Sequence, residues 1–178
     1  DCQEGSPEVT GSHVLIGVGR KPNTDTLNLK AGGIITDERG YILVNDTLET
    51  NIKGVFALGD CNGKGAFTHT SYNDYEIITA NKYQNEQRKV SDRIQTYALY
   101  IDPPLGRAGM TKKEALEKGY KLVEAKMPMS QVARAKEKGE TNGLMHVIAD
   151  ARSQKILGAA ILGVGGDEII SSILQHMY

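Results

Sequence analysis

A glycine and an aspartate at the end of one apolar run are the residues whose types could contact a ligand. Thr50 is followed, after six residues, by Ala-Leu-Gly-Asp, and the run 54–58 predicts a buried strand that stops at Gly59. A glycine there lets a ligand approach the backbone closely, and the Asp60 carboxylate can accept hydrogen bonds from a ligand hydroxyl. The same pair also fits an ordinary turn, because Gly-Asp is common turn chemistry. The residues alone leave both interpretations open.

A second motif lies upstream, where residues 18–24 read Val-Gly-Arg-Lys-Pro-Asn-Thr. This motif closes the apolar run 13–19, which is typical of a strand buried on both faces and ended by a Pro/Asn turn. The short segments 33–36 and 41–44 flank a polar turn that ends in Gly40, which favours a β-hairpin with Gly40 at positive φ. The two motifs therefore lie at the ends of predicted buried strands.

Residues 163–168 read Gly-Val-Gly-Gly-Asp-Glu between a predicted strand and a predicted helix. This is the setting of a dinucleotide-binding loop, but Glu168 stands where that fingerprint requires Gly or Ala. A tight strand-to-helix turn is the simpler interpretation, and a nucleotide-binding loop is the alternative.

The cysteines and histidines offer little chemistry of their own. Cys61 follows Asp60 but has no second thiol within a few residues, so we expect it not to carry out dithiol exchange. Cys2 is too far away in sequence to form a CxxC motif, and no metal-ligand spacing is present. We interpret His13 and His146 as packed or surface histidines on strands, and His176 as an ordinary helix position.

The elements that must position these residues indicate an α+β fold in two units. A helix is predicted from about residue 70 to 93, with Asp74 and Glu76 in its first turns, where the helix dipole favours acids. We place a boundary near residue 92. The second unit should contain a capping box at Thr111 and Glu114, and a final helix from about Asp167. Its strands are predicted at 96–101, 121–127, 144–149 and 156–162.

The motifs at 18–24 and 50–60, in this order and at this distance, closely resemble the C-terminal portion of the FAD-dependent pyridine nucleotide-disulfide oxidoreductases. That family includes glutathione reductase, lipoamide dehydrogenase and mercuric reductase. The resemblance implies that residues 1–92 end the NAD(P) domain and form the C-terminal strands and helix of the FAD-binding domain. It implies that Gly59 and Asp60 lie at the cofactor, with Asp60 binding a ribityl hydroxyl. It also implies that Thr68 and His69 begin a helix behind the flavin pyrimidine ring, and that the Ala66 carbonyl receives the nicotinamide carboxamide.

The resemblance continues beyond residue 92. The turn at Asp102-Pro103-Pro104, the segment 107–111 and the strand at 156–159 are similar to the family's dimerisation domain. Residues 93–178 are therefore expected to form an antiparallel sheet with packed helices and to assemble as a two-fold homodimer. In the intact enzyme the resemblance implies hydride transfer from NAD(P)H to FAD, and then electron transfer to a disulfide or another acceptor.

Several parts of the family pattern have no counterpart in this sequence. The sequence contains neither the N-terminal FAD fingerprint nor the CxxxxC disulfide. The catalytic His-Pro with its Glu is also absent, because His176 is followed by Met and Tyr. We therefore assign no catalytic residue and expect the chain, which starts at Asp1 and ends inside an apolar helix pattern, to be an inactive fragment. A self-association module without a catalytic role is the alternative.

Composition narrows the partners. The 178 residues carry a formal charge of −1, which gives no basic field for nucleic acid or an anionic membrane. No apolar run approaches the roughly 20 residues that cross a bilayer. Two distant cysteines fit a reducing, cytoplasmic setting. The expected cofactors of the parent enzyme are FAD and NAD(P)H, and no metal is expected.

Overall fold

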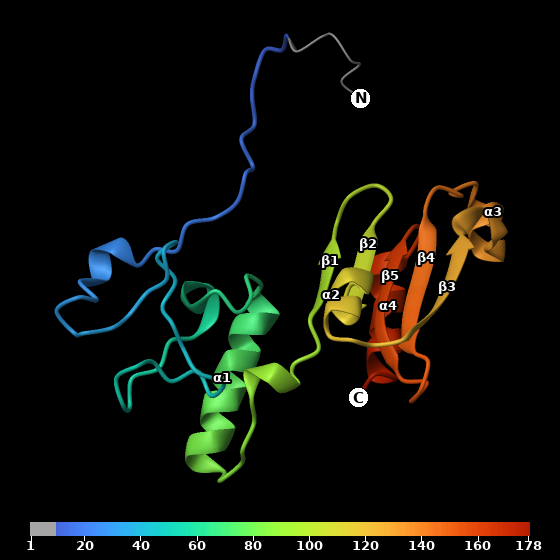
Figure 1. The fold of residues 1–178 in the computed structure, drawn as a ribbon. Helices are drawn as coiled ribbons and strands as arrows, with labels where there is room; N and C mark the ends of the chain where they lie inside the picture. Colours follow the sequence, from blue (N-terminus) through green and yellow to red (C-terminus); the bar gives the residue numbers. More distant parts are fainter. Residues whose placement is uncertain (1–9) are drawn as a thin grey trace. The chain divides into compact units, whose positions relative to one another are not determined.

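The computed structural model describes residues 10–178. The chain divides into two compact units at Gln87/Arg88, so the described part of the first unit is residues 10–87 and the second unit is Arg88–Tyr178. Figure 1 shows that the first unit is mostly irregular chain around one long helix, whereas the second contains a sheet with helices. Each unit is described by itself below.

The first unit is built around helix α1, Thr68–Tyr83, and two 3₁₀ helices, η1 at Asp25–Leu27 and η2 at Gly59–Asn62. Single antiparallel bridges join Thr36 to Ile42 and Glu49 to Phe56. The predicted hairpin is present only as one such bridge. Its turn is as expected, because Gly40 has φ 89° and the Asp37 N–H donates to the Tyr41 carbonyl at 2.8 Å.

Two predicted strands of this unit do not form. Residues 13–19 are extended but unpaired with any segment in the range 10–178, and Leu15 and Val18 are 97% and 91% exposed. A strand is stable only when its backbone groups have a neighbouring strand, so an apolar run by itself does not make one. The run at 54–58 contributes only the Phe56 bridge, although Ala57 is buried.

Helix α1 is shorter than predicted, ending at Tyr83 instead of near residue 93. Gln84 closes the helix by donating its N–H to the Ala80 carbonyl, and Asn85 then takes a left-handed conformation with φ 56°. A left-handed residue after the last turn is a common helix stop, and asparagine tolerates it well. The polar residues that follow therefore lie in an irregular connection.

The second unit contains a five-stranded, fully antiparallel sheet in the order β1-β2-β5-β4-β3. This sheet, together with its helices, confirms the predicted α+β class. The strands are β1 Thr96–Leu99, β2 Leu105–Gly109, β3 Leu122–Pro128, β4 Leu144–Asp150 and β5 Ile156–Leu162. The helices are α2 Lys112–Glu117, α3 Ala133–Lys138 and α4 Gly166–Gln175, with 3₁₀ turns η3 at Val90–Asp92 and η4 at Met129–Gln131. The capping box of α2 forms as predicted, between Thr111 and Glu114.

Strand β2 was not predicted, because its sequence Leu-Gly-Arg-Ala-Gly lacks the β-branched residues that mark strands. Packing explains the small residues. A Cβ on Gly106 would lie 2.0 Å from the Gly166 carbonyl oxygen, so α4 lies directly on this strand. The glycine that weakens the strand signal is thus the one that admits the helix.

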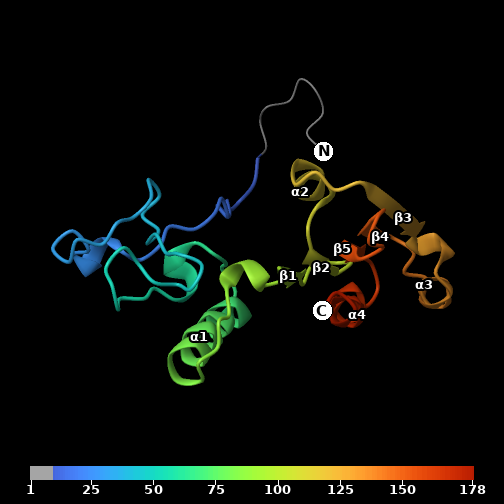
Figure 2. The same cartoon turned by 60° about the horizontal axis from the view of Figure 1, so that its bottom comes forward.

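Helices α2 and α4 lie on opposite faces of the sheet (Figure 2). Under α4 the core is Ala108, Ala159, Ile161 and Ile170, whereas under α2 it is Ala115, Ile148 and Leu157. Leu157 and Ala159 would share a face in a regular strand. They serve different cores because the pairing of β4 with β5 shifts register at Ile148/Ala149.

None of the helices formed by residues 10–178 combines the length and the apolar character that a membrane span requires.

Candidate functional site

Gly59 and Asp60 lie in the first turn of η2. Gly59 has φ 74°, a left-handed conformation that glycine adopts without steric cost. A Cβ at this position would lie 2.8 Å from the Ser71 hydroxyl oxygen of α1. The Asp60 side chain is 55% exposed, and its Oδ2 accepts a hydrogen bond from Arg20 Nη1 at 3.2 Å. The carboxylate therefore faces outward from a turn that is pressed against the helix.

The Ala66 carbonyl shares the hydrogen-bond donor of Asp60. Arg20 Nη1 donates to the Ala66 oxygen at 2.9 Å as well as to the Asp60 carboxylate. One nitrogen thus reaches both acceptors, so the two oxygens face a common point. They border an open depression of about 620 Å³, whose other lining residues include Lys21, Tyr41, Cys61, Gly63 and Gly65.

Thr68 and His69 are the first two residues of α1, as the family resemblance implies, and both are exposed. Within the described part of the chain, no side chain caps this helix start and no acid lies in its first turn. The partial positive charge of a helix N-terminus is therefore not offset by its own first turn. The rings of Phe67 and His69 stack with centroids 5.4 Å apart, which keeps the His69 ring beside the start of the helix.

The loop before α1 also approaches the helix closely. A Cβ on Gly65 would lie 2.2 Å from Thr70 Cγ2, and Thr70 is buried. Glycines at 59 and 65 thus allow both ends of this loop to lie against α1. The helix start, Asp60 and the Ala66 carbonyl consequently belong to one local structure.

Asp74 is a site residue that sequence reasoning missed. It was expected in the first turns of the helix as a partner of the dipole, and it lies in the second turn of α1, but its side chain is fully buried. Its Oδ2 accepts hydrogen bonds from the Gly59 N–H at 2.9 Å and from Asn62 Nδ2 at 2.8 Å. A buried acid twelve residues from a buried asparagine gives no local sequence signal, because the pairing is tertiary.

Cys61 is half-buried, and its thiol donates to the Leu58 carbonyl at 3.1 Å. Burial raises the pKa of this thiol, with smaller contributions from the carboxylates of Asp74 and Asp60. The thiol therefore stays protonated at neutral pH and is a weak nucleophile. Cys2 lies outside the described residues.

The dinucleotide-like segment 163–168 forms a tight turn whose interior is filled by protein. A Cβ on Gly163 would lie 2.4 Å from the Met129 side chain, and one on Gly166 would lie 2.4 Å from the Ile161 carbonyl oxygen. The glycines are thus used for packing of α4 and η4 on β5, which is the simpler of the two interpretations.

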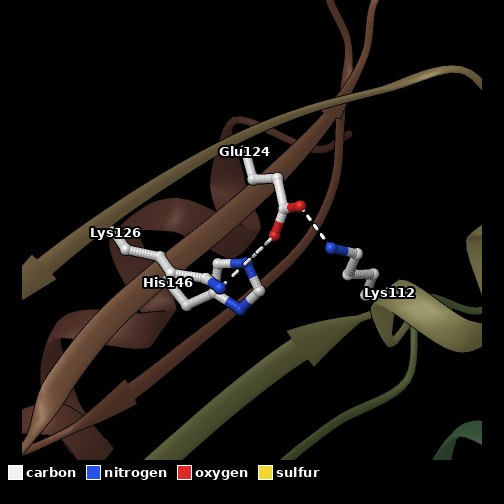
Figure 3. A network of polar contacts seen from close by, with 4 residues as sticks. All are labelled: Lys112, Glu124, Lys126 and His146. Atoms are coloured by element: carbon white, nitrogen blue, oxygen red, sulfur yellow. Dashed lines mark hydrogen bonds and ion pairs between the residues drawn. The ribbon is translucent and has the colours of Figure 1, made fainter.

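A second group of polar side chains lies on the sheet of the second unit (Figure 3). Glu124 on β3 contacts Lys112 of α2, and it lies 3.0 Å from His146 Nε2 on β4 and 3.7 Å from Lys126. Hydrogen bonding to Lys112, and secondarily to His146, lowers the pKa of the Glu124 carboxyl. An ion pair thus joins α2 to β3, and a hydrogen bond joins β3 to β4. His146 thus lies on a strand, as predicted, whereas His13 lies in the unpaired segment. His176 caps α4, with its Nδ1 2.7 Å from the Ser172 carbonyl.

No cluster of three or more potential metal-binding side chains occurs among residues 10–178. The polar groups around Asp60 are instead a carboxylate, a carbonyl and a guanidinium, which suit hydroxyl or amide groups of an organic ligand.

Two family models match the chain, each over one of its parts. Residues 3–79 match the model described as pyridine nucleotide-disulphide oxidoreductase, and residues 96–178 match the dimerisation domain of the same enzymes. The chain belongs to the pyridine nucleotide-disulphide oxidoreductase family.

Individual members of this family are similar along nearly the whole chain. The probable pyridine nucleotide-disulfide oxidoreductase RclA of Escherichia coli is 34% identical over 92% of this chain and 37% of its own length. Mercuric reductase of Staphylococcus aureus is 31% identical, over 91% of this chain and 30% of its own length. Dihydrolipoyl dehydrogenase 3 of Haloarcula marismortui is 31% identical, over 93% of this chain and 35% of its own length. The chain thus spans 30–37% of the length of these relatives.

Solved structures of flavoprotein disulfide reductases share the fold of this chain. The HOCl-induced flavoprotein disulfide reductase RclA from Escherichia coli superposes with a TM-score of 0.80 at 33% identity, covering 90% of this chain and 37% of that one. LpdA from Mycobacterium tuberculosis has the same fold, with a TM-score of 0.83 at 21% identity over 95% of this chain and 37% of its own.

Proposed function

We propose that this chain supplies one wall of the FAD site and the dimerisation domain of a homodimeric flavoprotein reductase of this family. The first unit would hold the end of the NAD(P) domain and the C-terminal part of the FAD-binding domain, and residues 93–178 would form the subunit interface. The observation that carries the proposal is that the Asp60 carboxylate and the Ala66 carbonyl face one donor beside the start of α1.

These residues suit a flavin by their chemistry. Asp60 offers an exposed carboxylate that can accept from a ribityl hydroxyl, as it now accepts from Arg20. Gly59, with no side chain, lets the turn that carries Asp60 lie against α1. The Ala66 carbonyl can accept a hydrogen bond from a carboxamide N–H. Arg20 demonstrates that a single donor reaches both oxygens at once.

The beginning of α1 would act electrostatically. Thr68 and His69 present backbone N–H groups at a helix start whose first turn, within the described chain, carries no acid. Such a start stabilises negative charge nearby, by about 0.3–1 kcal/mol at exposed positions and more where water is excluded. When bound, FAD would supply two-electron transfer between NAD(P)H and a disulfide or another acceptor.

Other parts of the parent enzyme would supply the redox disulfide and the dinucleotide-binding fingerprints. This chain spans only 30–37% of the length of these relatives, which leaves room in the parent for a redox disulfide and a dinucleotide fingerprint. We therefore propose that the 178-residue chain does not turn over by itself. We also propose that the parent enzyme works in the cytoplasm, because two cysteines far apart in sequence fit a reducing compartment.

A self-association module without catalytic function is the second candidate. It is favoured by the second unit, which has its own sheet and two cores and matches the dimerisation-domain model. The two candidates differ in what they predict for flavin binding by the full-length protein, since the module alone needs none.

The test is Asp60→Ala in the full-length protein. Loss of a hydrogen bond to a charged acceptor should weaken FAD binding by about 1–3 kcal/mol, measured by titrating the apoprotein with FAD and following flavin fluorescence. The matched control is Asp25→Ala, which removes an exposed aspartate that forms an ion pair with Lys21 at 3.0 Å in the same unit. Equal FAD affinity in Asp60→Ala and the parent protein would contradict the proposed site.

A further inference from the structure

The buried carboxylate of Asp74 joins helix α1 to both ends of η2. Its Oδ2 accepts from the backbone N–H of Gly59, the first residue of η2, and from Nδ2 of Asn62, the last. The same Asn62 nitrogen also donates to the Ala57 carbonyl at 3.0 Å, just before η2. Asp74 is 0% exposed and Asn62 5%, so water does not compete for these bonds.

A carboxylate at this position is costly unless its hydrogen bonds are made. Burying a charged group without partners is strongly unfavourable, so the structure that provides its donors is favoured over alternatives. A carboxylate is also an acceptor only, which fixes the direction of both bonds. The Gly59 N–H must therefore point toward the helix, and the turn between Gly59 and Asn62 cannot rotate without breaking a charged bond.

Fixing this turn fixes the direction of Asp60. Asp60 is the second residue of η2, between the two residues that Asp74 holds, and its own side chain points outward to Arg20. Asp74 does not line the depression bordered by Asp60 and Ala66. Its hydrogen bonds to Gly59 and Asn62 hold the turn that carries Asp60, so its effect on a ligand would pass through that turn.

We infer that Asp74 is a positioning residue of the flavin site, holding η2 against α1 so that the Asp60 carboxylate faces the same point as the Ala66 carbonyl. This inference rests on the proposed function of Asp60 in flavin binding. It extends that function to a residue on the opposite side of the turn.

The experiment compares four versions of the full-length protein, the parent, Asp74→Asn, Asp60→Ala and the double variant, and adds one control variant. Asp74→Asn keeps the shape of the side chain but removes its charge and replaces one acceptor with a donor. We expect Asp74→Asn to weaken FAD binding about tenfold, which corresponds to about 1.4 kcal/mol. The matched control is Glu76→Gln, which removes a carboxylate two residues away on the same helix and should leave FAD affinity unchanged.

The double variant separates positioning from general destabilisation. If Asp74 acts through Asp60, then Asp74→Asn should cause less than about a twofold further loss in the Asp60→Ala background. A full, additive tenfold loss there would overturn the inference, while the Asp60 proposal would stand on its own single variant.

Hydrogen exchange supplies a readout that does not depend on FAD. In the apoprotein, the segment 57–63 should exchange faster in Asp74→Asn than in the parent or in Glu76→Gln, because the Gly59 N–H loses its charged acceptor. Unchanged exchange would overturn the inference. If Asp60→Ala leaves FAD affinity intact, the proposed site fails, and with it the positioning of a flavin ligand, even where exchange shows the turn to be held by Asp74.

Discussion

Replacing Gly59 with alanine tests whether η2 is really pressed against α1. The substitution has two costs. At φ 74° an L-residue loses about 1–2 kcal/mol relative to glycine. In addition, the new Cβ would lie 2.8 Å from the Ser71 hydroxyl oxygen, well inside ordinary contact distance. Because that oxygen is a single atom on a rotatable side chain, we place the steric cost near about 1 kcal/mol, the low end for overpacking.

The second variant removes only the steric part. Ser71→Ala deletes the hydroxyl, whose hydrogen bond to the Phe67 carbonyl is long at 3.4 Å, so alone it should change stability by less than about 0.5 kcal/mol. We expect Gly59→Ala to cost about 2–3 kcal/mol in the parent background and about 1–2 kcal/mol in Ser71→Ala.

The assay is urea unfolding of the four proteins in this cycle, followed by far-ultraviolet circular dichroism. The predicted coupling between the two positions is about 1 kcal/mol, whereas distant, independent sites add within about 0.3–0.5 kcal/mol. Additive single changes would refute the contact between the turn and the helix, and with it the local structure on which the flavin proposal depends.

Two further predictions concern the second unit. Gly106 does not have a left-handed φ, so in an open strand Gly106→Ala would stabilise the protein by about 0.5–1 kcal/mol. Here the added Cβ would lie 2.0 Å from the Gly166 carbonyl oxygen. We therefore expect Gly106→Ala to lower the free energy of unfolding by about 3 kcal/mol, seen as a lower thermal midpoint. A raised midpoint would contradict the packing of α4 on β2. Hydrogen bonds from Thr111, first from its backbone N–H, lower the pKa of Glu114 below its ordinary value of 4.5. A lowered folded pKa contributes stability above pH 4.5 that is lost as the pH falls through the folded value. Glu114→Gln should therefore show a smaller decrease in urea midpoint between about pH 5 and pH 3 than the parent, and equal decreases would exclude Glu114 as a source of the acid dependence.

The sequence predicted those features whose causes are local. The capping box at Thr111 and Glu114 needs residues only three positions apart, and the strands β3, β4 and β5 carry apolar patterns of their own. Strand β2 escaped prediction because Gly106 is selected by a helix sixty residues later in the chain. The strand predicted at residues 13–19 was wrong for the opposite reason. Its apolar pattern is strong, but the described chain offers no strand to pair with it.

The same distinction holds at the candidate site. The family resemblance implied a helix start at Thr68 from its offset to Asp60, and α1 does begin there. Gly59 and Asp60 were chosen as site residues from the same resemblance, because Gly-Asp by itself also fits an ordinary turn. The contacts of Arg20 and Asp74 could not be predicted from the sequence, because only the folded chain creates them. Arg20 contacts Asp60 forty residues later, and Asp74 contacts Gly59 from inside helix α1.

The register shift between β4 and β5 limits where insertions and deletions can be tolerated in this unit during evolution. A strand that serves two cores cannot gain or lose one residue freely, because every side chain on one side of the insertion would exchange faces. The irregular pairing beside Leu157 is the one place in β5 where the ladder already accommodates an unmatched residue. Length variation in relatives with this sheet should therefore collect in the β4–β5 turn and at this irregularity, and the stretch from Ala159 to Leu162 should keep a constant length.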